Sequence, residues 1–116
     1  MLSDRQDSFN TDMAIFILWC KSQGYKITRG EAYRTQYQQD EYFRTGYSRV
    51  EHSQHQDKLA QDLNFFFDGI SMWQISSPQL KTAMQHIGDK WESLREGNRW
   101  GGNFSSFFDP GHFEAK

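Results

Sequence analysis

The sequence is poor in several features that would each point to a particular class of protein. It holds a single cysteine, Cys20, so an internal disulfide and a cysteine-rich structural zinc site are both excluded. Its net charge is −2 and its Arg and Lys residues form no basic stripe, so no nucleic-acid partner is expected. Because Cys20 lies in an apolar helical run, we expect it to be a small core residue.

Long hydrophobic segments are lacking as well. The one strongly apolar run, residues 14–20, is much shorter than the roughly 20 residues that a membrane-spanning helix needs. Acidic Asp4, Asp7 and Asp12 precede this run, where a signal peptide would carry positive charge. We therefore expect no membrane insertion and a protein that is made without its own export signal.

The length and composition predict one globular domain over residues 1–116. The chain is long enough to close one modest core, and 24% of its residues are charged and 16% aromatic, as in ordinary globular proteins. No internal repeat, low-complexity linker or second domain is visible in the sequence.

Local signals predict three helices. Apolar residues at helical spacing indicate a first helix from Ser8 to about Gln23, before Gly24. Thr35 can cap a second helix through about Arg44, which Gly46 would end. A third helix is expected from Pro78, a residue favoured in the first helical turn, to about Leu94.

Strands and loops are predicted between these helices. We expect strands within residues 25–34 and over residues 58–67, the latter ended by the turn signal Asp68-Gly69. Residues 47–57 and 95–110 are expected to be loops, and a last short strand should include His112 and Phe113. The mixture predicts an α+β fold, with a short antiparallel sheet flanked by about three helices.

The predicted strand over residues 58–67 carries the first candidate site residues. On a strand, Ala60, Asp62 and Asn64 would share one face, opposite a face that carries large apolar side chains. His55, in the loop before the strand, could reach the same point as the Asp62 carboxylate. Spacing alone leaves a second interpretation open, in which Asp62 simply faces solvent.

A second candidate cluster lies near the C-terminus, in Asp109-Pro110-Gly111-His112. The proline and glycine favour a tight turn that can bring the acid and the histidine toward one site. These residues are also compatible with a solvated tail. The aromatic residues around them favour a tail that packs onto the domain instead: Phe104, Phe107, Phe108 and Phe113.

Two histidines and a carboxylate are a suitable donor set for a catalytic zinc ion. Three protein ligands leave a fourth position for water, whose pKa the metal can lower to about 7. A further carboxylate is then needed to take and pass on a proton, and Asp109 is the best candidate. Glu114 is the alternative, or a residue that orients one of the ligands.

At this point the chain resembles a known family, the M15 zinc peptidases. The matching pieces are Ser53-x-His55, then Leu59-Ala60-x-Asp62-Leu63, and finally Asp109-x-x-His112. The upstream Tyr33-Arg34-Thr35 segment, with its glutamines, is similar to the segment before the first ligand in these enzymes. The segments Trp91-Glu92 and Arg99-Trp100-Gly101-Gly102 resemble phage members of the family in particular. The resemblance as a whole spans about residues 25–114.

The resemblance implies a role for each matching residue. It implies that His55, Asp62 and His112 bind one Zn²⁺ at the sheet, and that Asp109 is the general acid/base. Arg34 would bind substrate or stabilise the oxyanion, since its forked donors match a developing negative charge. The remaining implied roles are substrate binding by Ser53, Gln39 and Trp100 and orientation of a ligand by Glu114.

Two positions depart from the family pattern. Many members carry glycine where this chain has Lys58, and some have glutamate where it has Asp109. Neither departure removes a metal ligand, so the two changes bear on substrate preference and rate.

The resemblance implies a peptidoglycan peptidase of the phage or prophage endolysin type, which cuts the L-Ala–D-Glu bond of the stem peptide. We expect a monomer without a separate wall-binding domain, made in the host cytoplasm and acting on the wall after release. One alternative is a D-Ala-D-Ala carboxypeptidase, with a cationic pocket supplied by Arg34, Arg44, Arg49 or Arg99. Another is a non-catalytic zinc-containing binding module, whose fourth ligand would be His52 or His86.

Overall fold

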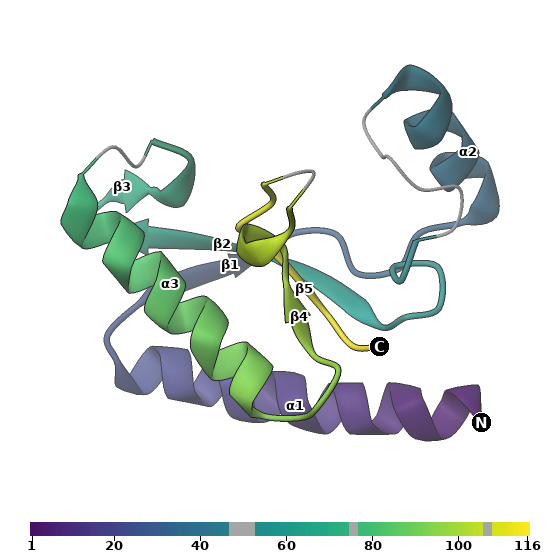
Figure 1. Ribbon diagram of the computed structural model, residues 1–116, viewed down its shortest axis with the longest axis horizontal. Coiled ribbons are helices and arrows are strands. Elements are labelled where there is room, and N and C mark those ends of the chain that lie inside the picture. The colour runs from purple at the N-terminus through teal and green to yellow at the C-terminus, as the bar shows by residue number, and fades with distance from the viewer. Residues whose placement is uncertain (47–52, 75–76, 106–107) are drawn as a thin grey trace.

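The computed structural model describes residues 1–46, 53–74, 77–105 and 108–116. Within these ranges the chain forms an α+β fold, as predicted, with a small antiparallel sheet and helices on either side of it (Figure 1). The elements are α1 (Leu2–Ser22), β1 (Lys26–Arg29), α2 (Gln36–Thr45), β2 (Ala60–Phe67), β3 (Ile70–Ser71), η1 (Met72–Gln74), α3 (Pro78–Ser93), β4 (Arg99–Trp100), η2 (Gly101–Asn103) and β5 (His112–Glu114).

The predicted helix ends are confirmed at α2 and α3. The hydroxyl of Thr35 accepts a hydrogen bond from the amide of Gln38, and Gly46 ends α2 with φ +83°. The hydroxyl of Ser77 caps α3 in the same way, and Pro78 occupies its first turn. Local side-chain chemistry therefore sets these boundaries.

Helix α1 begins six residues before the predicted start at Ser8. No side chain caps its first turn, so this start lacks the capping residue that marks the starts of α2 and α3. Contact with the other end of the chain helps to hold the early turns, since Arg5 Nε donates to the carbonyl of Lys116 at 3.1 Å.

Strand β2 organises the sheet, because β1, β3 and β5 pair with different parts of its length, while β4 pairs with β5. The order is β1-β2-β5-β4, all antiparallel, and β3 pairs with the far end of β2 through the predicted turn at Asp68-Gly69. Both turn residues have positive φ, as a two-residue hairpin turn requires. The register places Asp62 of β2 directly opposite His112 of β5.

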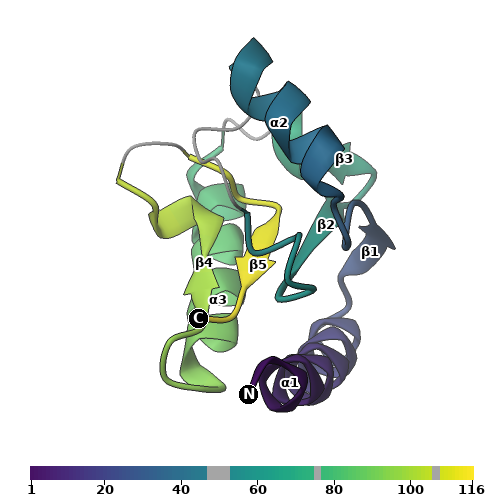
Figure 2. The ribbon, with the colours of Figure 1, turned by 90° about the vertical axis from the view of Figure 1, so that its right-hand side faces the viewer.

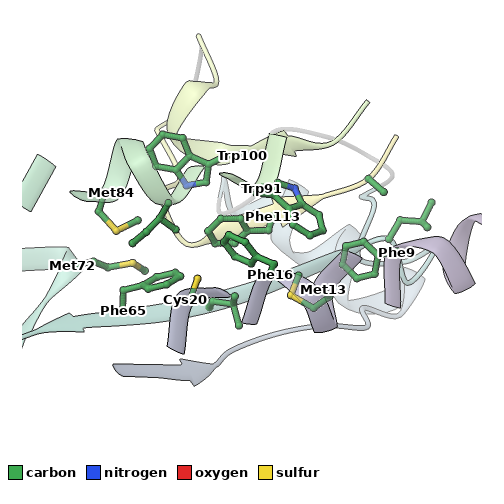
Figure 3. Close-up of a cluster of buried hydrophobic side chains, with 14 of the residues drawn as sticks. Phe9, Met13, Phe16, Cys20, Phe65, Met72, Met84, Trp91, Trp100 and Phe113 are labelled. Atoms are coloured by element: carbon green, nitrogen blue, oxygen red, sulfur yellow. The ribbon is translucent and has the colours of Figure 1, made fainter. Parts of the chain in front are cut away.

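The core lies between β2, α1 and α3, while α2 stands on the opposite side of the molecule from α1 (Figures 1 and 2). Burial alternates along β2 as predicted, so the large apolar side chains face the core and Asp62 and Asn64 face outward. Aromatic rings from three elements meet there: Phe16 lies 5.4 Å from Trp91 and 4.9 Å from Phe113, centroid to centroid (Figure 3).

Cys20 is buried in this core, as predicted. Burial raises the pKa of its thiol to about 12, so the thiol stays protonated at physiological pH.

An ion pair between the buried carboxylate of Asp12 and the half-exposed guanidinium of Arg95 joins α1 to the segment that follows α3. Arg95 donates to the Asp12 carboxylate twice, at 2.8 and 3.1 Å, and Asn98 Nδ2 donates to it at 3.2 Å. This Asp12 network links residues more than eighty positions apart and stabilises the packing of α1 against the loop that leads to β4.

Within the described part of the chain, no helix has the length and apolar character needed to cross a lipid bilayer.

Candidate metal centre and catalytic site

Three predicted metal ligands meet at the edge where β2 pairs with β5. His55 comes from the turn that follows α2, Asp62 from β2 and His112 from β5. One donor atom from each lies within 4.8 Å of the others. The antiparallel register accounts for the closeness of Asp62 and His112, since paired residues have side chains on the same face.

The donor atoms converge on one point. Asp62 Oδ1 lies 3.2 Å from His55 Nε2 and 3.3 Å from His112 Nδ1. The two imidazole nitrogens lie 3.2 Å from each other. We call these three side chains the metal cluster.

His55 is oriented by backbone groups. Its Nδ1 lies 2.7 Å from the carbonyl of Ala32, which can only accept, so Nδ1 carries the proton and Nε2 is left with its lone pair toward Asp62. The amide of His55 donates to Ser53 Oγ, and its carbonyl accepts from the amide of Arg34. The turn therefore fixes both the position and the tautomer of His55.

His112 is oriented from the opposite side. Its Nε2 lies 2.7 Å from Glu114 Oε1, so the proton of the neutral ring is on Nε2 and Nδ1 faces Asp62. Arg99 Nη1 lies 3.7 Å from the other oxygen of Glu114, and the Phe104 ring lies 5.7 Å from the imidazole. The hydrogen bond between His112 and Glu114 is the contact that the predicted orienting role of Glu114 requires.

The backbone of Asp62 is fixed by the segment that follows β1. Its amide donates to the carbonyl of Glu31 at 2.7 Å, and its carbonyl accepts from the amide of Gly30 at 2.8 Å. A side chain at Gly30 would crowd this approach, because a Cβ there would lie 3.2 Å from Asp62 Cβ. The same segment thus holds Asp62 and, through Ala32, His55.

Charges within the metal cluster shift the pKa values of its members. Burial opposes ionisation of Asp62, but the interactions of its carboxylate with His112 and His55 outweigh the burial and lower the pKa of Asp62 to about 2. Burial also disfavours the charged form of His112, yet hydrogen bonds to Asp62 and Glu114 raise its pKa to about 9. In the metal-free protein a proton on His112 therefore supplies the positive charge that the two carboxylates require.

Asp109 lies in a tight turn beside the cluster. Its amide donates to the carbonyl of Gly101 and its carbonyl accepts from the amide of His112, while Trp100 Nε1 donates to the carbonyl of Pro110. Gly101 is required at this approach, since a Cβ there would lie 2.0 Å from the carbonyl oxygen of Asp109. Burial, with a contribution from the charge of Asp62, raises the pKa of Asp109, although nearby cationic groups oppose the shift.

Arg34 is buried, and its guanidinium is held by its own neighbours. Glu31 contacts both Nε and Nη2, and the side-chain oxygen of Gln39 accepts from Nη1 at 2.6 Å. The guanidinium also lies over the Tyr42 ring at 4.7 Å. Gln39, predicted to bind substrate, thus uses its oxygen to position Arg34.

Two other residues predicted to bind substrate lie inside the protein. Trp100 is 2% exposed, and its ring packs so closely on Gly88 that a Cβ there would lie 2.1 Å from it. Ser53 is buried and its hydroxyl accepts from the amide of His55. These contacts do not favour direct substrate binding by Trp100 or Ser53, since both side chains stabilise the loops that carry other site residues.

The family departure at Lys58 has a conformational explanation. Lys58 has φ +59°, a left-handed conformation that glycine adopts without a steric penalty. A glycine at this position would therefore suit the turn between His55 and β2 of this chain.

Sequence reasoning missed the residues that act through their backbone. Ala32 and Gly101 contribute carbonyls, and nothing in their side chains could have indicated this. Of the remaining candidates, His86 packs against Trp19 and Arg44 pairs with Glu41. The predictions for Arg49, His52 and Phe107 lie outside the described residues.

The donor set of the metal cluster fits zinc. Two neutral imidazole nitrogens and one carboxylate oxygen are the three ligands found in many catalytic zinc sites. With Nδ1 of His55 and Nε2 of His112 bound to acceptors, the remaining lone pairs face one another, an arrangement that a cation would stabilise.

Comparisons with known proteins show the family of this chain. The M15 peptidase family described as D-alanyl-D-alanine carboxypeptidase matches residues 46–115, more than half of the chain. The fold is similar to that of the crystal structure of the Serratia marcescens L-Ala D-Glu endopeptidase ChiX, with a TM-score of 0.56 and 23% identity. That match covers 78% of this chain and 66% of ChiX, and no curated protein matches. The chain therefore belongs to the M15 family of peptidases.

Proposed function

We propose that the protein is a zinc-dependent peptidoglycan peptidase that hydrolyses the L-Ala–D-Glu bond of the stem peptide. One observation carries this proposal: the ring nitrogens of His55 and His112 that face inward converge with the Asp62 carboxylate, and Asp109 lies in the turn beside them. The family match supports a peptidase. The fold similarity to an L-Ala D-Glu endopeptidase supports the choice of bond.

In this proposal His55, Asp62 and His112 hold one zinc ion. Zinc bound there would polarise the scissile carbonyl and lower the pKa of water at the site toward about 7. The contacts from Ala32 and Glu114 keep the two imidazoles turned toward the ion. The ligands therefore need little rearrangement on binding.

Asp109 acts as the general acid/base. Its raised pKa makes its carboxylate a stronger base than a solvated aspartate, so it takes a proton from the attacking water and returns it to the leaving amine. The turn at Gly101 and the Trp100–Pro110 hydrogen bond hold the backbone of this segment in place.

Arg34 stabilises the oxygen that becomes negative during attack. Glu31 and Gln39 hold the guanidinium rigidly, which avoids an ordering cost when substrate binds. Loss of this positive charge should therefore reduce kcat more than substrate affinity.

Digestion of purified peptidoglycan tests the proposal. We expect the zinc-loaded protein to release new N-terminal D-glutamate, and an Asp109→Asn variant with unchanged zinc content to be at least about a hundredfold slower. Release of D-alanine without new D-glutamate termini would contradict the proposal. Full activity of the Asp109→Asn variant would contradict the role of Asp109.

The D-Ala-D-Ala carboxypeptidase remains a second candidate because the family description names that activity. It requires a cation for the terminal carboxylate of the substrate. In the structure Arg34 is held by Glu31, and Arg99 lies near Glu114 and over the Phe104 ring. Because the proposal assigns Arg34 to the developing oxyanion and Arg99 already pairs with Glu114, neither is left for the terminal carboxylate, and the endopeptidase is the better supported candidate.

A phage or prophage origin, with release of a monomeric enzyme from the host cytoplasm to the wall, is part of the same proposal. Its support is the resemblance of the Trp91-Glu92 and Arg99–Gly102 segments to phage members. Lysis of sensitive cells by added protein, measured as a fall in turbidity, tests whether the enzyme acts on intact walls.

A further inference from the structure

Trp73 is a large aromatic residue that the core does not use. It lies in η1, directly after β3, and 59% of its surface is exposed. Its indole is nevertheless held in place, because Nε1 donates to Asn64 Oδ1 at 3.4 Å. A Cβ at Gly111 would lie 3.4 Å from ring atom Cζ2, so the indole also lies against the turn that leads to His112.

These two contacts place the ring next to the metal cluster. Asn64 follows Asp62 by two residues on the same face of β2, which corresponds to roughly 7 Å along a strand. Gly111 directly precedes His112. A substrate bound at the cluster and extending along β2 would therefore meet the exposed face of Trp73.

An exposed indole held at its edge is well suited to stack on a sugar. The apolar C–H face of a pyranose ring packs against an aromatic face, and the rigid side chain loses little conformational entropy in doing so. The two groups that contact the indole, the Asn64 side chain and the Gly111 backbone, are uncharged.

The chemistry of peptidoglycan places a sugar at the required distance. The stem peptide is attached through its first L-alanine to the lactyl group of the muramoyl sugar. In cleavage of the L-Ala–D-Glu bond, one residue and the lactyl group separate the sugar from the scissile carbonyl, or roughly 7 Å of extended chain. In cleavage of D-Ala–D-Ala the separation is about four residues, or more than roughly 13 Å.

We propose that Trp73 forms a saccharide subsite that stacks on the muramoyl sugar of the substrate. The inference rests on the proposed endopeptidase function and adds to it a preference for substrates that carry the sugar. It distinguishes this enzyme from one that recognises the stem peptide alone.

Hydrolysis of two soluble substrates by the zinc-loaded full chain tests the subsite. The substrates are a muramoyl pentapeptide and the same pentapeptide without the sugar, both starting with L-Ala-D-Glu. We expect kcat/KM to be about tenfold higher with the sugar, mainly through KM, as one aromatic stacking contact would give. A Trp73→Ala variant should lose this preference while its activity on the free peptide stays unchanged, and Trp73→Phe should retain part of the preference.

Leu18→Ala is a matched control, because it also removes an exposed apolar side chain, on the outer face of α1. It should leave the preference for the sugar unchanged. Equal activity of the original protein on both substrates would overturn the subsite, as would an equal loss on both substrates in Trp73→Ala.

A binding measurement separates this inference from the proposed function. If neither substrate is cut at L-Ala–D-Glu, calorimetric titration with muramoyl-L-Ala-D-Glu and with L-Ala-D-Glu still reports on the sugar. Tighter binding of the muramoyl ligand that is lost in Trp73→Ala supports the subsite even though the proposed reaction fails. Equal affinities for the two ligands overturn it.

Discussion

Two aspartates of this protein lie among side-chain nitrogen atoms, yet they depend on different sources of positive charge. Asp12, which is 3% exposed, receives hydrogen bonds from Arg95 and Asn98. Asp62 lies between His55 and His112. The guanidinium is charged at every accessible pH, whereas an imidazole is charged only after it takes up a proton.

The difference shows which cluster can do chemistry. The chain neutralises Asp12 permanently, so the Asp12 network serves packing between α1 and the loop before β4. The charge of Asp62 is balanced by a proton on His112 or by a metal ion, both of which can exchange with solvent. A carboxylate with an exchangeable counter-charge is therefore the better candidate for a functional site.

The largest expected effect separates the two aspartates by metal content. An Asp62→Asn variant should lose tight zinc binding, and its hydrolysis of peptidoglycan should fall at least about a thousandfold, because a neutral amide replaces an anionic ligand. Elemental analysis of the purified protein and the release of new D-glutamate termini measure the two effects. The Asp12→Asn variant is the control, and equal zinc content in the two variants would remove the distinction.

The second prediction concerns the pH dependence of the metal-free protein. The pKa of His112 is about 9 when folded and near 6.5 when unfolded, so its contribution to stability is complete below about pH 6.5 and is lost as the pH rises toward 9. We expect the free energy of unfolding to fall over this range by on the order of 3 kcal/mol. Urea unfolding of chelator-treated protein at several pH values measures it.

The Asp12 network supplies the comparison for this pH dependence. An Asp12→Asn variant should keep the decline between pH 6.5 and 9, while a His112→Asn variant should lose it. A decline of the same size in both variants would show that its origin lies elsewhere. At low pH the sign reverses: Asp62, with a folded pKa of about 2, contributes stability that is lost as the pH falls from about 4 toward 2.

The third prediction is that Asp12 serves stability and not zinc binding. Asp12→Asn replaces a buried oxygen that accepts hydrogen bonds from Arg95 and Asn98 with an amide group that brings donors of its own, so we expect the free energy of unfolding to fall by about 2 kcal/mol. Chemical unfolding of the zinc-loaded protein measures this loss. If the Asp12→Asn variant kept the stability of the original protein but lost its zinc, the role that we assign to Asp12 would be wrong.

The smallest expected effect concerns the backbone that carries His55. Lys58→Gly relieves the left-handed conformation, whereas Lys58→Ala keeps it, and both variants remove the contact of Lys58 with the Tyr33 ring. We therefore expect the glycine variant to be more stable than the alanine variant by about 1 kcal/mol, with equal zinc content. Equal stabilities would show that the turn does not strain Lys58.

Short-range signals in the sequence predicted much of the fold. The caps at Thr35 and Ser77-Pro78 and the alternation along β2 each act within a few residues, so they can be interpreted without knowing the fold. Strands β3 and β4 were missed because two residues are too short to show a periodic pattern. They form only because β2 and β5 offer partners.

The candidate site was predictable to the extent that its side chains carry the chemistry. The sequence resemblance indicated His55, Asp62 and His112, and the structure brings them together, while their binding of zinc stays a prediction. The hydrogen bonds around Arg34 and the exposed position of Trp73 depend on contacts that no local pattern records. Long-range contacts were therefore the part that required the structure.

The hydrogen bond from His55 to the carbonyl of Ala32 has a consequence for protein engineering. Every residue type has this carbonyl, so almost any substitution at position 32 can keep the contact, and an alignment column there could vary freely. A transplant of the three ligands into another scaffold would nevertheless lose it, because the contact belongs to the path of the chain. The smallest portable unit of this site therefore includes the segment from Gly30 to Arg34 as well as the ligands.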